Sequence, residues 1–318
     1  NGEVVAFEFG AAPAEVKLFP EFKTKVWAYD GRVPGPTLRI RLGQTLRLKF
    51  TNALPQPTTI HWHGVRVPHA MDGVPGVTQA PIEPGEIFVY EFTPKDPGTY
   101  WFHPHVRGAE QLERGLYGAL IVEDAKPAPY SRDLVWILDD WRLMEDAQIY
   151  DKFVTGGDIS HDGRWGNVPT VNGRVQPTIA FNPGERIRLR LINSANARIF
   201  RPDFTALKAT GIAFDGMTAS RPFDPAGYDL APGNRLDLDI TIPGETNNHP
   251  FRARNTRCKR RRKAIAHRAT LWAKQALTCA KGKTFIRPER KIASAMRNNN
   301  IIGKNVLQMA HHSCHINR

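Results

Sequence analysis

Four of the eleven histidines form two His-x-His pairs, His61 with His63 and His103 with His105. Side chains two residues apart in a β-strand project from the same face, so each pair presents two imidazoles together, and two neighbouring strands would bring all four into one patch. Imidazole binds copper, zinc, iron or nickel, and four such rings exceed what a core buries without a partner. We therefore predict a metal site, whereas a single pair would more simply be two polar surface residues.

Two other histidines stand apart from these pairs. His69 follows a proline, and His161 lies alone in a loop rich in Asp and Gly. We expect both to be ordinary surface residues.

The elements that must position the pairs are strands. Between residues 4 and 124, short apolar or β-branched runs alternate with Gly and Pro turns at the spacing of an all-β sandwich. A second stretch of the same character runs from about residue 133 to residue 243. The clearest predicted strands are residues 45–50, 87–92 and 118–122 in the first stretch and 134–138, 186–192 and 236–242 in the second. Residues 125–130, which contain two prolines, are typical of a linker.

Two segments, residues 40–50 and 179–192, share a pattern. In each, a turn that contains glycine leads into a strand of alternating basic and aliphatic residues, and each strand then reaches an asparagine, Asn52 or Asn193. The pattern predicts two copies of one fold.

At the histidine pairs the sequence resembles a known family. The segments similar to the first cupredoxin domain of the multicopper oxidases are residues 59–64 (Thr-Ile-His-Trp-His-Gly), 71–75 (Met-Asp-Gly-Val-Pro), 81–85 (Pro-Ile-Glu-Pro-Gly) and 98–105 (Gly-Thr-Tyr-Trp-Phe-His-Pro-His). Those that resemble the family's second, copper-free domain are residues 171–173 and 183–193. The resemblance covers about residues 4–245. It implies two consecutive Greek-key β-sandwiches of cupredoxin type, the first at residues 1–125 and the second at 131–246.

The resemblance also implies roles for individual residues. In the family, the residue matching His61 binds the type 2 copper, and those matching His63, His103 and His105 bind the paired type 3 coppers. Copper is therefore the implied cofactor, in a three-copper cluster that reduces dioxygen to water. Asp72 matches an acid near this cluster that helps to deliver the protons that the reaction consumes. The alternative is that Asp72 is a solvated loop acid beside a glycine.

The resemblance breaks off where the family carries its third cupredoxin domain, with the other cluster histidines and the type 1 copper. Residues 249–251 (His-Pro-Phe) look like the opening of one signature of that domain, but an arginine-rich sequence follows. Near the end of the chain, Cys314 and His315 match a second signature, while Ser313 stands where a cluster ligand belongs. Cys314 and His315 are therefore the remaining candidate copper ligands.

Residues 247–318 form an atypical basic tail. Of the chain's 44 Lys and Arg, 18 lie in residues 251–318, against the single acid Glu289, so the tail accounts for the net charge of +13. We interpret it as disordered, or as sequence translated out of frame after Phe251, because the regular pattern ends inside a motif. The alternative, which we favour less, is a segment that binds nucleic acid or an anionic surface through phosphate contacts.

These features predict a copper-dependent oxidoreductase that couples one-electron oxidation of a small reductant to the reduction of dioxygen. The candidate reductants are a phenol, another organic molecule or cuprous ion, although the five methionines do not cluster into a soft site for cuprous ion. The alternative is a copper-binding or structural protein without turnover, because the four histidines are only half of the eight that the family's cluster uses.

Location and assembly are less visible in the sequence. The chain starts at Asn1 with no initiator methionine or leader, which suits a mature exported chain, so we expect a periplasmic or secreted protein. No apolar run approaches the roughly 18 residues that a membrane helix needs. The three cysteines all lie in the tail, so the first 250 residues contain no disulfide. Nothing in the sequence indicates an oligomeric state.

Overall fold

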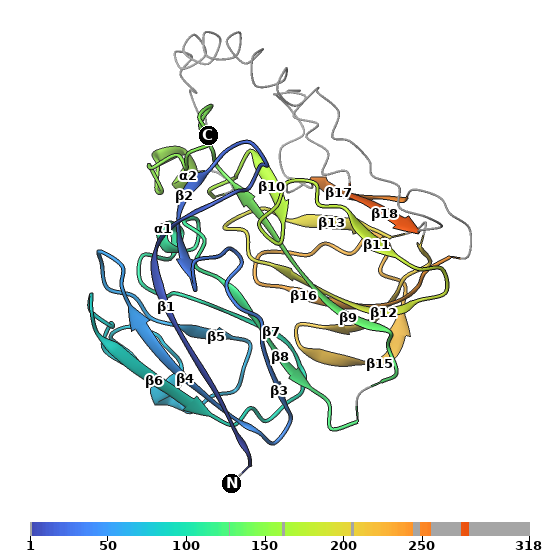
Figure 1. The fold of residues 1–318 in the computed structure, drawn as a ribbon, viewed down its shortest axis with the longest axis horizontal. Helices are drawn as coiled ribbons and strands as arrows, with labels where there is room; N and C mark the ends of the chain where they lie inside the picture. Colours follow the sequence, from blue (N-terminus) through green and yellow to red (C-terminus); the bar gives the residue numbers. More distant parts are fainter. Residues whose placement is uncertain are drawn as a thin grey trace, which may run out of the picture. The chain divides into compact units, whose positions relative to one another are not determined.

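The structure is a computed structural model of the chain. It describes residues 2–126, 128–160, 163–204 and 207–243 with their side chains, and residues 249–255 and 275–279 as backbone strands. Within the compact unit Asn1–Lys281 the described elements are nearly all strands, arranged as two β-sandwiches (Figure 1), which confirms the all-β prediction. The second unit, Gly282–Arg318, lies outside the described residues.

Helical structure in the described part is limited to short pieces, which are η1 (His69–Met71), α1 (Gly108–Gln111) and α2 (Gly156–Ser160). None of the described helices has the length and apolar character that crossing a membrane requires. The site and its supports are therefore built on strands and turns.

The first sandwich consists of two sheets with the strand orders β2-β1-β4-β6 and β3-β8-β7-β5. Its strands are β1 (Val4–Val16), β2 (Thr24–Tyr29), β3 (Leu38–Arg41), β4 (Thr45–Asn52), β5 (His61–His63), β6 (Ile87–Phe92), β7 (Gly98–His103) and β8 (Gly118–Glu123). β1 runs parallel to β4 and β3 parallel to β8, whereas the other neighbours are antiparallel. The chain therefore crosses between the sheets, as Greek-key sandwiches do.

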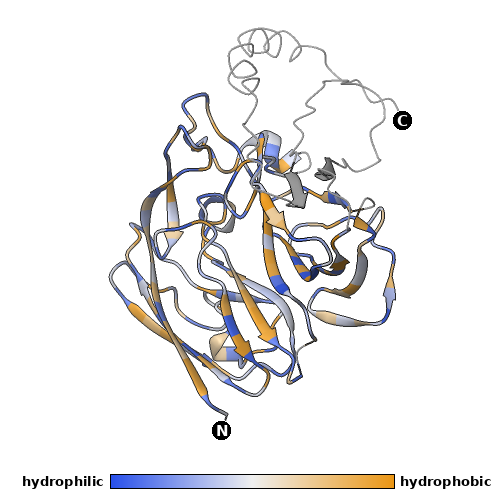
Figure 2. Cartoon of the chain, turned by 45° about the vertical axis from the view of Figure 1, so that its right-hand side comes forward, coloured by the Kyte–Doolittle hydropathy of each residue, from blue (hydrophilic) through white to orange (hydrophobic). Residues whose placement is uncertain are grey.

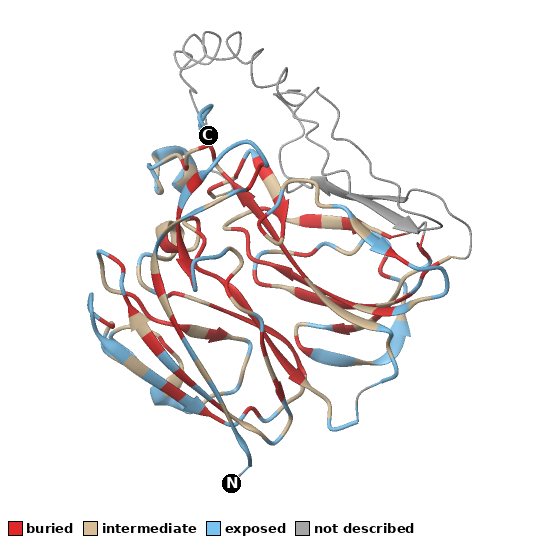
Figure 3. Ribbon diagram, in the orientation of Figure 1, coloured by how far each residue is buried: buried red, intermediate tan, exposed pale blue. Residues whose placement is uncertain are grey.

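Alternation of apolar and polar residues decides which side of each strand is buried. In β4, Leu46, Leu48 and Phe50 are fully buried, whereas Arg47 and Lys49 between them are exposed. The same stripes appear as alternating hydropathy and burial colours along the strands in Figures 2 and 3. Because successive side chains point to opposite faces, the period of two places one face of each sheet in the core.

The second sandwich consists of a six-stranded sheet, in the order β10-β9-β12-β16-β14-β15, and a four-stranded sheet, in the order β11-β18-β17-β13. Its strands are β9 (Arg132–Trp141), β10 (Val168–Val171), β11 (Ile179–Phe181), β12 (Arg186–Asn193), β13 (Phe200–Asp203), β14 (Thr210–Phe214), β15 (Met217–Phe223), β16 (Arg235–Thr241), β17 (His249–Asn255) and β18 (Gln275–Cys279). Trp136, Leu189 and Leu236 belong to a separate hydrophobic core.

The predicted repeat is present in the strand pairing. β9 runs parallel to β12, which pairs with β16, as β1 runs parallel to β4, which pairs with β6. The two matched asparagines are fully buried and make the same three hydrogen bonds. The side-chain amide of Asn52 donates to two carbonyls and its oxygen accepts from the backbone two residues on, and Asn193 does the same.

Two strands of the second sandwich were not predicted. β17 and β18 belong to the basic tail, in which the sequence showed no strand period, yet β17 pairs with β13 and β18 pairs with β11. Backbone pairing explains this difference, because an open sheet edge accepts an extended segment whatever its side-chain pattern.

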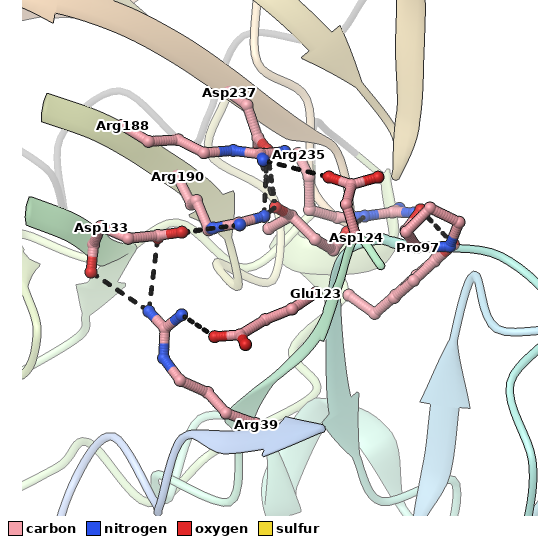
Figure 4. Close-up of polar contacts among 11 residues, drawn as sticks. Arg39, Pro97, Glu123, Asp124, Asp133, Arg188, Arg190, Arg235 and Asp237 are labelled. Carbon is pink, nitrogen blue, oxygen red and sulfur yellow. Dashed lines mark hydrogen bonds and ion pairs between the residues drawn. The ribbon is translucent and has the colours of Figure 1, made fainter. Parts of the chain in front are cut away.

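A charge network joins the two sandwiches beside β7 (Figure 4). Of the residues labelled there, Arg39 belongs to the first sandwich and Asp133, Arg188, Arg190 and Asp237 to the second. Thr99 of β7 also takes part. Arg190, with a side chain only 2% exposed, donates two hydrogen bonds of 2.7 Å to Asp133 and one of 2.8 Å to the hydroxyl of Thr99. The Thr99 hydroxyl donates to Asp237, 2.7 Å from Oδ1 and 2.9 Å from Oδ2, and Oδ2 also accepts from Arg188 and Arg190. The strand that carries His103 is thus held by the second sandwich.

Candidate metal centre

The two histidine pairs lie on adjacent strands, as the sequence predicted. β5 pairs antiparallel with β7, with His61 opposite His103 and His63 opposite Trp101. The residue between the first two histidines, Trp62, is fully buried in the core, so both imidazoles project from the other face of the strand. The second pair differs from the expectation in one respect, because His105 lies just beyond the end of β7 instead of within it.

The structure brings all four imidazoles together. The ring centroids of His61 and His105 are 4.7 Å apart, those of His61 and His103 are 5.4 Å apart, and those of His63 and His103 are 5.6 Å apart. Nitrogen atoms of His61, His103 and His105 all lie within 4.8 Å of one another, and Nδ1 of His63 is 3.3 Å from Nε2 of His103. A cluster this tight is what shared metal ions require.

Backbone carbonyls fix the orientation of two of the rings. Nδ1 of His61 lies 2.8 Å from the carbonyl oxygen of Asp72, and Nδ1 of His103 lies 3.0 Å from that of Pro104. A carbonyl can only accept, so both Nδ1 atoms carry the proton, and each Nε2 carries a lone pair, which in His103 faces Nδ1 of His63. Metal-binding histidines are commonly anchored in this way through their second nitrogen.

The surroundings also keep three of the imidazoles neutral, which is the form that binds a metal. Burial, and then the nearby charge of Arg235, lower the pKa of His63 to about 4. Burial and the neighbouring His61 lower the pKa of His103 well below its ordinary value, and the same two causes lower that of His105. These donors therefore fit copper, and at neutral pH these three rings need lose no proton to bind it.

The indole of Trp101 stacks on two of the rings, His63 and His103. Trp101 stacks on His103 with ring centroids 4.2 Å apart and on His63 with centroids 4.9 Å apart, both near 30°. The residue is 3% exposed. Trp101 thus restricts how far either imidazole can tilt.

Asp72 lies at the edge of the cluster. Its carboxylate oxygen is 3.3 Å from Nδ1 of His61, and its side chain is 32% exposed. It therefore contacts both the cluster and solvent, and its role in proton delivery stays a prediction.

The remaining sequence candidates lie elsewhere. His69 is exposed, as expected of a surface residue, and does not belong to the cluster. His161, Cys314 and His315 lie outside the described residues.

Two residues of the second sandwich border the site although the sequence analysis did not select them. Gly233 packs against the ring of His63, and the guanidinium of Arg235 lies against Gly64, which follows His63. Gly233 belongs to an ordinary Pro-Gly turn, so its local sequence carries no sign of this contact.

Comparison with known proteins gives consistent results. A family model described as multicopper oxidase matches residues 12–127. Copper resistance protein A from Escherichia coli is 33% identical over 261 residues, which cover 68% of this chain and 43% of that protein. The chain thus spans less than half the length of this relative.

Solved structures are similar over a larger share of their length. The multicopper oxidase from Pseudomonas thermotolerans is 39% identical, with a TM-score of 0.75 over 80% of this chain and 62% of that one. Lac15 from a marine microbial metagenome is 31% identical, with a TM-score of 0.70 over 90% of this chain and 69% of that one.

Proposed function

The chain belongs to the multicopper oxidase family, whose cofactor is copper, and from this premise we propose that its four converging imidazoles hold copper ions that pass electrons from a small reductant to dioxygen. The observation that carries the proposal is the cluster itself, because His61, His103 and His105 offer nitrogens within 4.8 Å of one another. Bound copper would supply one-electron redox chemistry there, which protein side chains alone do not provide.

The protein's own groups would have three tasks. His63 and His103, whose nitrogens are 3.3 Å apart, would share one ion, while His61 and His105 would bind beside them. Partial burial limits the access of water to His61, His63 and His103, whereas His105 is exposed. Asp72 would hold a proton at its carboxylate, take it from solvent and release it toward the cluster, because it contacts both.

A second candidate is copper binding without turnover. The observation that favours it is the size of the cluster that the described residues form, because four imidazoles are half of the eight that the family resemblance implies. The two candidates differ in oxygen consumption and agree in copper binding.

The name of the relative copper resistance protein A makes cuprous ion one candidate reductant, beside a phenol or another organic molecule. We also propose a periplasmic or secreted location. Fractionation of the source cells tests the location, because the chain should appear outside the cytoplasm.

The central test measures copper and oxygen on the same preparation. Elemental analysis of the purified chain gives the copper content, and an oxygen electrode gives uptake with cuprous ion and with a phenol. The variant His103→Ala should lose copper and uptake together, whereas the matched surface variant His69→Ala should keep both. Copper bound with no uptake on any reductant would favour the second candidate, and no copper in the wild type would refute both.

A further inference from the structure

The second sandwich, which holds no predicted copper ligand among its described residues, touches the imidazole cluster through one turn. Gly233 lies in this turn with φ of +83°, a conformation that other residues adopt only with strain. A Cβ atom added to Gly233 would lie 2.9 Å from Cε1 and 3.2 Å from Nε2 of His63. Glycine alone therefore leaves the imidazole where it is, between the turn and the stacked indole of Trp101.

Arg235 connects this turn to the strand that carries His103. Its Nε donates to the carbonyl of Thr99 on β7 at 3.1 Å, its Nη1 to the carbonyl of Gly233 at 2.9 Å, and its Nη2 to that of Asp215 at 2.8 Å. The residue is 4% exposed. Three carbonyls in three directions fix a planar guanidinium in a way that a single charge would not.

The same guanidinium also reaches the strand that carries His63. A Cβ atom on Gly64, directly after His63, would overlap with Nη2 of Arg235. Arg235 thus contacts the backbone just after β5 and the backbone of β7, the two strands that carry His61, His63 and His103. Figure 4 shows it beside the charge network that joins the sandwiches.

The charge of Arg235 cannot be what favours a metal, because a cation beside the site repels another cation. The carboxylate of Asp215, 3.5 Å from Nη1, offsets part of this repulsion. The benefit of Arg235 must therefore be geometric.

We propose that Gly233 and Arg235 form a clamp with which the copper-free sandwich positions His63 for copper binding. The clamp rests on the proposed copper site. It implies that the copper affinity of this site depends on contacts from the second sandwich. Residues that orient ligands without touching the metal commonly change its affinity by about 10–100-fold when they are replaced.

The test compares two glycine variants of the full chain in a titration with copper against a competing chelator. Gly233→Ala adds a methyl group that overlaps sterically with the ring of His63. Gly227→Ala is the matched control, because Gly227 has a similar φ of +76° but nothing within 4 Å of an added Cβ. Gly233→Ala should weaken copper binding at least about tenfold, and Gly227→Ala should bind like the wild type. Equal affinity in the two variants would overturn the proposal.

Arg235→Lys provides a second variant, because it keeps the positive charge but cannot span three carbonyls. It should lose copper affinity to a similar extent, whereas Arg39→Met, which removes an ion pair with Asp133 across the same interface but on β3, should retain it. Wild-type affinity in folded Arg235→Lys would contradict the clamp. If both variants lost copper affinity equally, Arg235 would have only a structural role, which would also contradict the clamp.

A measurement without copper separates the clamp from the copper site. In the metal-free wild type, NMR should show a nuclear Overhauser effect between the Hα protons of Gly233 and Hε1 of His63. Its absence would refute the clamp whatever copper does. A wild type that shows the peak but binds no copper would refute the proposed function and leave the contact intact.

Discussion

Replacing Arg190 with methionine should be among the most destabilising single changes at the junction of the two sandwiches. The side chain is 2% exposed and makes hydrogen bonds to Asp133 at 2.7 Å, to Thr99 at 2.8 Å and to Asp237 at 3.2 Å. Methionine is shorter than arginine but similar in volume and carries no charge, so the cavity is small and the loss is mainly electrostatic.

The expected loss of stability depends on the partners that the two aspartates keep after Arg190 is replaced. Removing one partner of a buried ion pair typically costs about 3–5 kcal/mol, because the other charge stays buried. Here Asp237 keeps Arg188 at 2.7 Å and Asp133 keeps Arg39 at 3.3 Å. We therefore expect the lower end, about 3 kcal/mol, which for a unit of this size lowers the melting temperature by about 6–12 °C.

The assay is urea unfolding followed by fluorescence, supported by thermal melting. Arg186→Met is the matched control, because Arg186 lies four residues earlier on β12 and pairs with Asp239 of β16, but its side chain is 48% exposed. It should melt like the wild type, since exposed ion pairs contribute little. If the two variants shifted the midpoint equally, the buried network would not carry the stability that we assign to it.

Two further changes test other parts of the molecule. Relative to the wild type, Asp139→Asn should be stabilised increasingly as pH rises above about 4. Burial, with the charges of Asp140 and Glu113, raises the pKa of Asp139 well above its usual value. The folded wild type therefore keeps a proton that the unfolded chain releases. The gain is at most about 1.4 kcal/mol per pH unit, read from unfolding free energies at pH 5, 6.5 and 8, and a difference that did not vary with pH would contradict it. Asp72→Asn keeps the backbone carbonyl that anchors His61 and loses the carboxylate, so copper content should be unchanged while oxygen uptake slows about 100-fold or more. Uptake at the wild-type rate would make Asp72 a simple loop residue.

Much of the first sandwich was predictable because its information is local. The period of two in β4 decides which side chains are buried, and the spacing of His61 and His63 decides that both project together. The matched asparagines, Asn52 and Asn193, likewise sit at equivalent positions of a repeat, so the sequence pattern was enough to find them.

What could not be predicted depends on contacts between distant segments. Gly233 and Arg235 follow an ordinary turn signal, and only the packing of β16 beside β7 brings them to His63. Sequence patterns assign acids such as Asp139 to the surface because the carboxylate side chain is polar. The backbone pairing of β17 and β18 could not be predicted because it does not require alternation of apolar and polar side chains.

The junction between the sandwiches also limits how the protein can be reduced in size. A truncated version that ended near residue 125 would retain every described imidazole of the cluster, but it would leave the hydroxyl of Thr99 and the guanidinium of Arg39 without Asp237 and Asp133. It would also free His63 on the side that Gly233 covers. A miniature copper protein made from this chain would therefore need a redesigned surface in place of the half it discards.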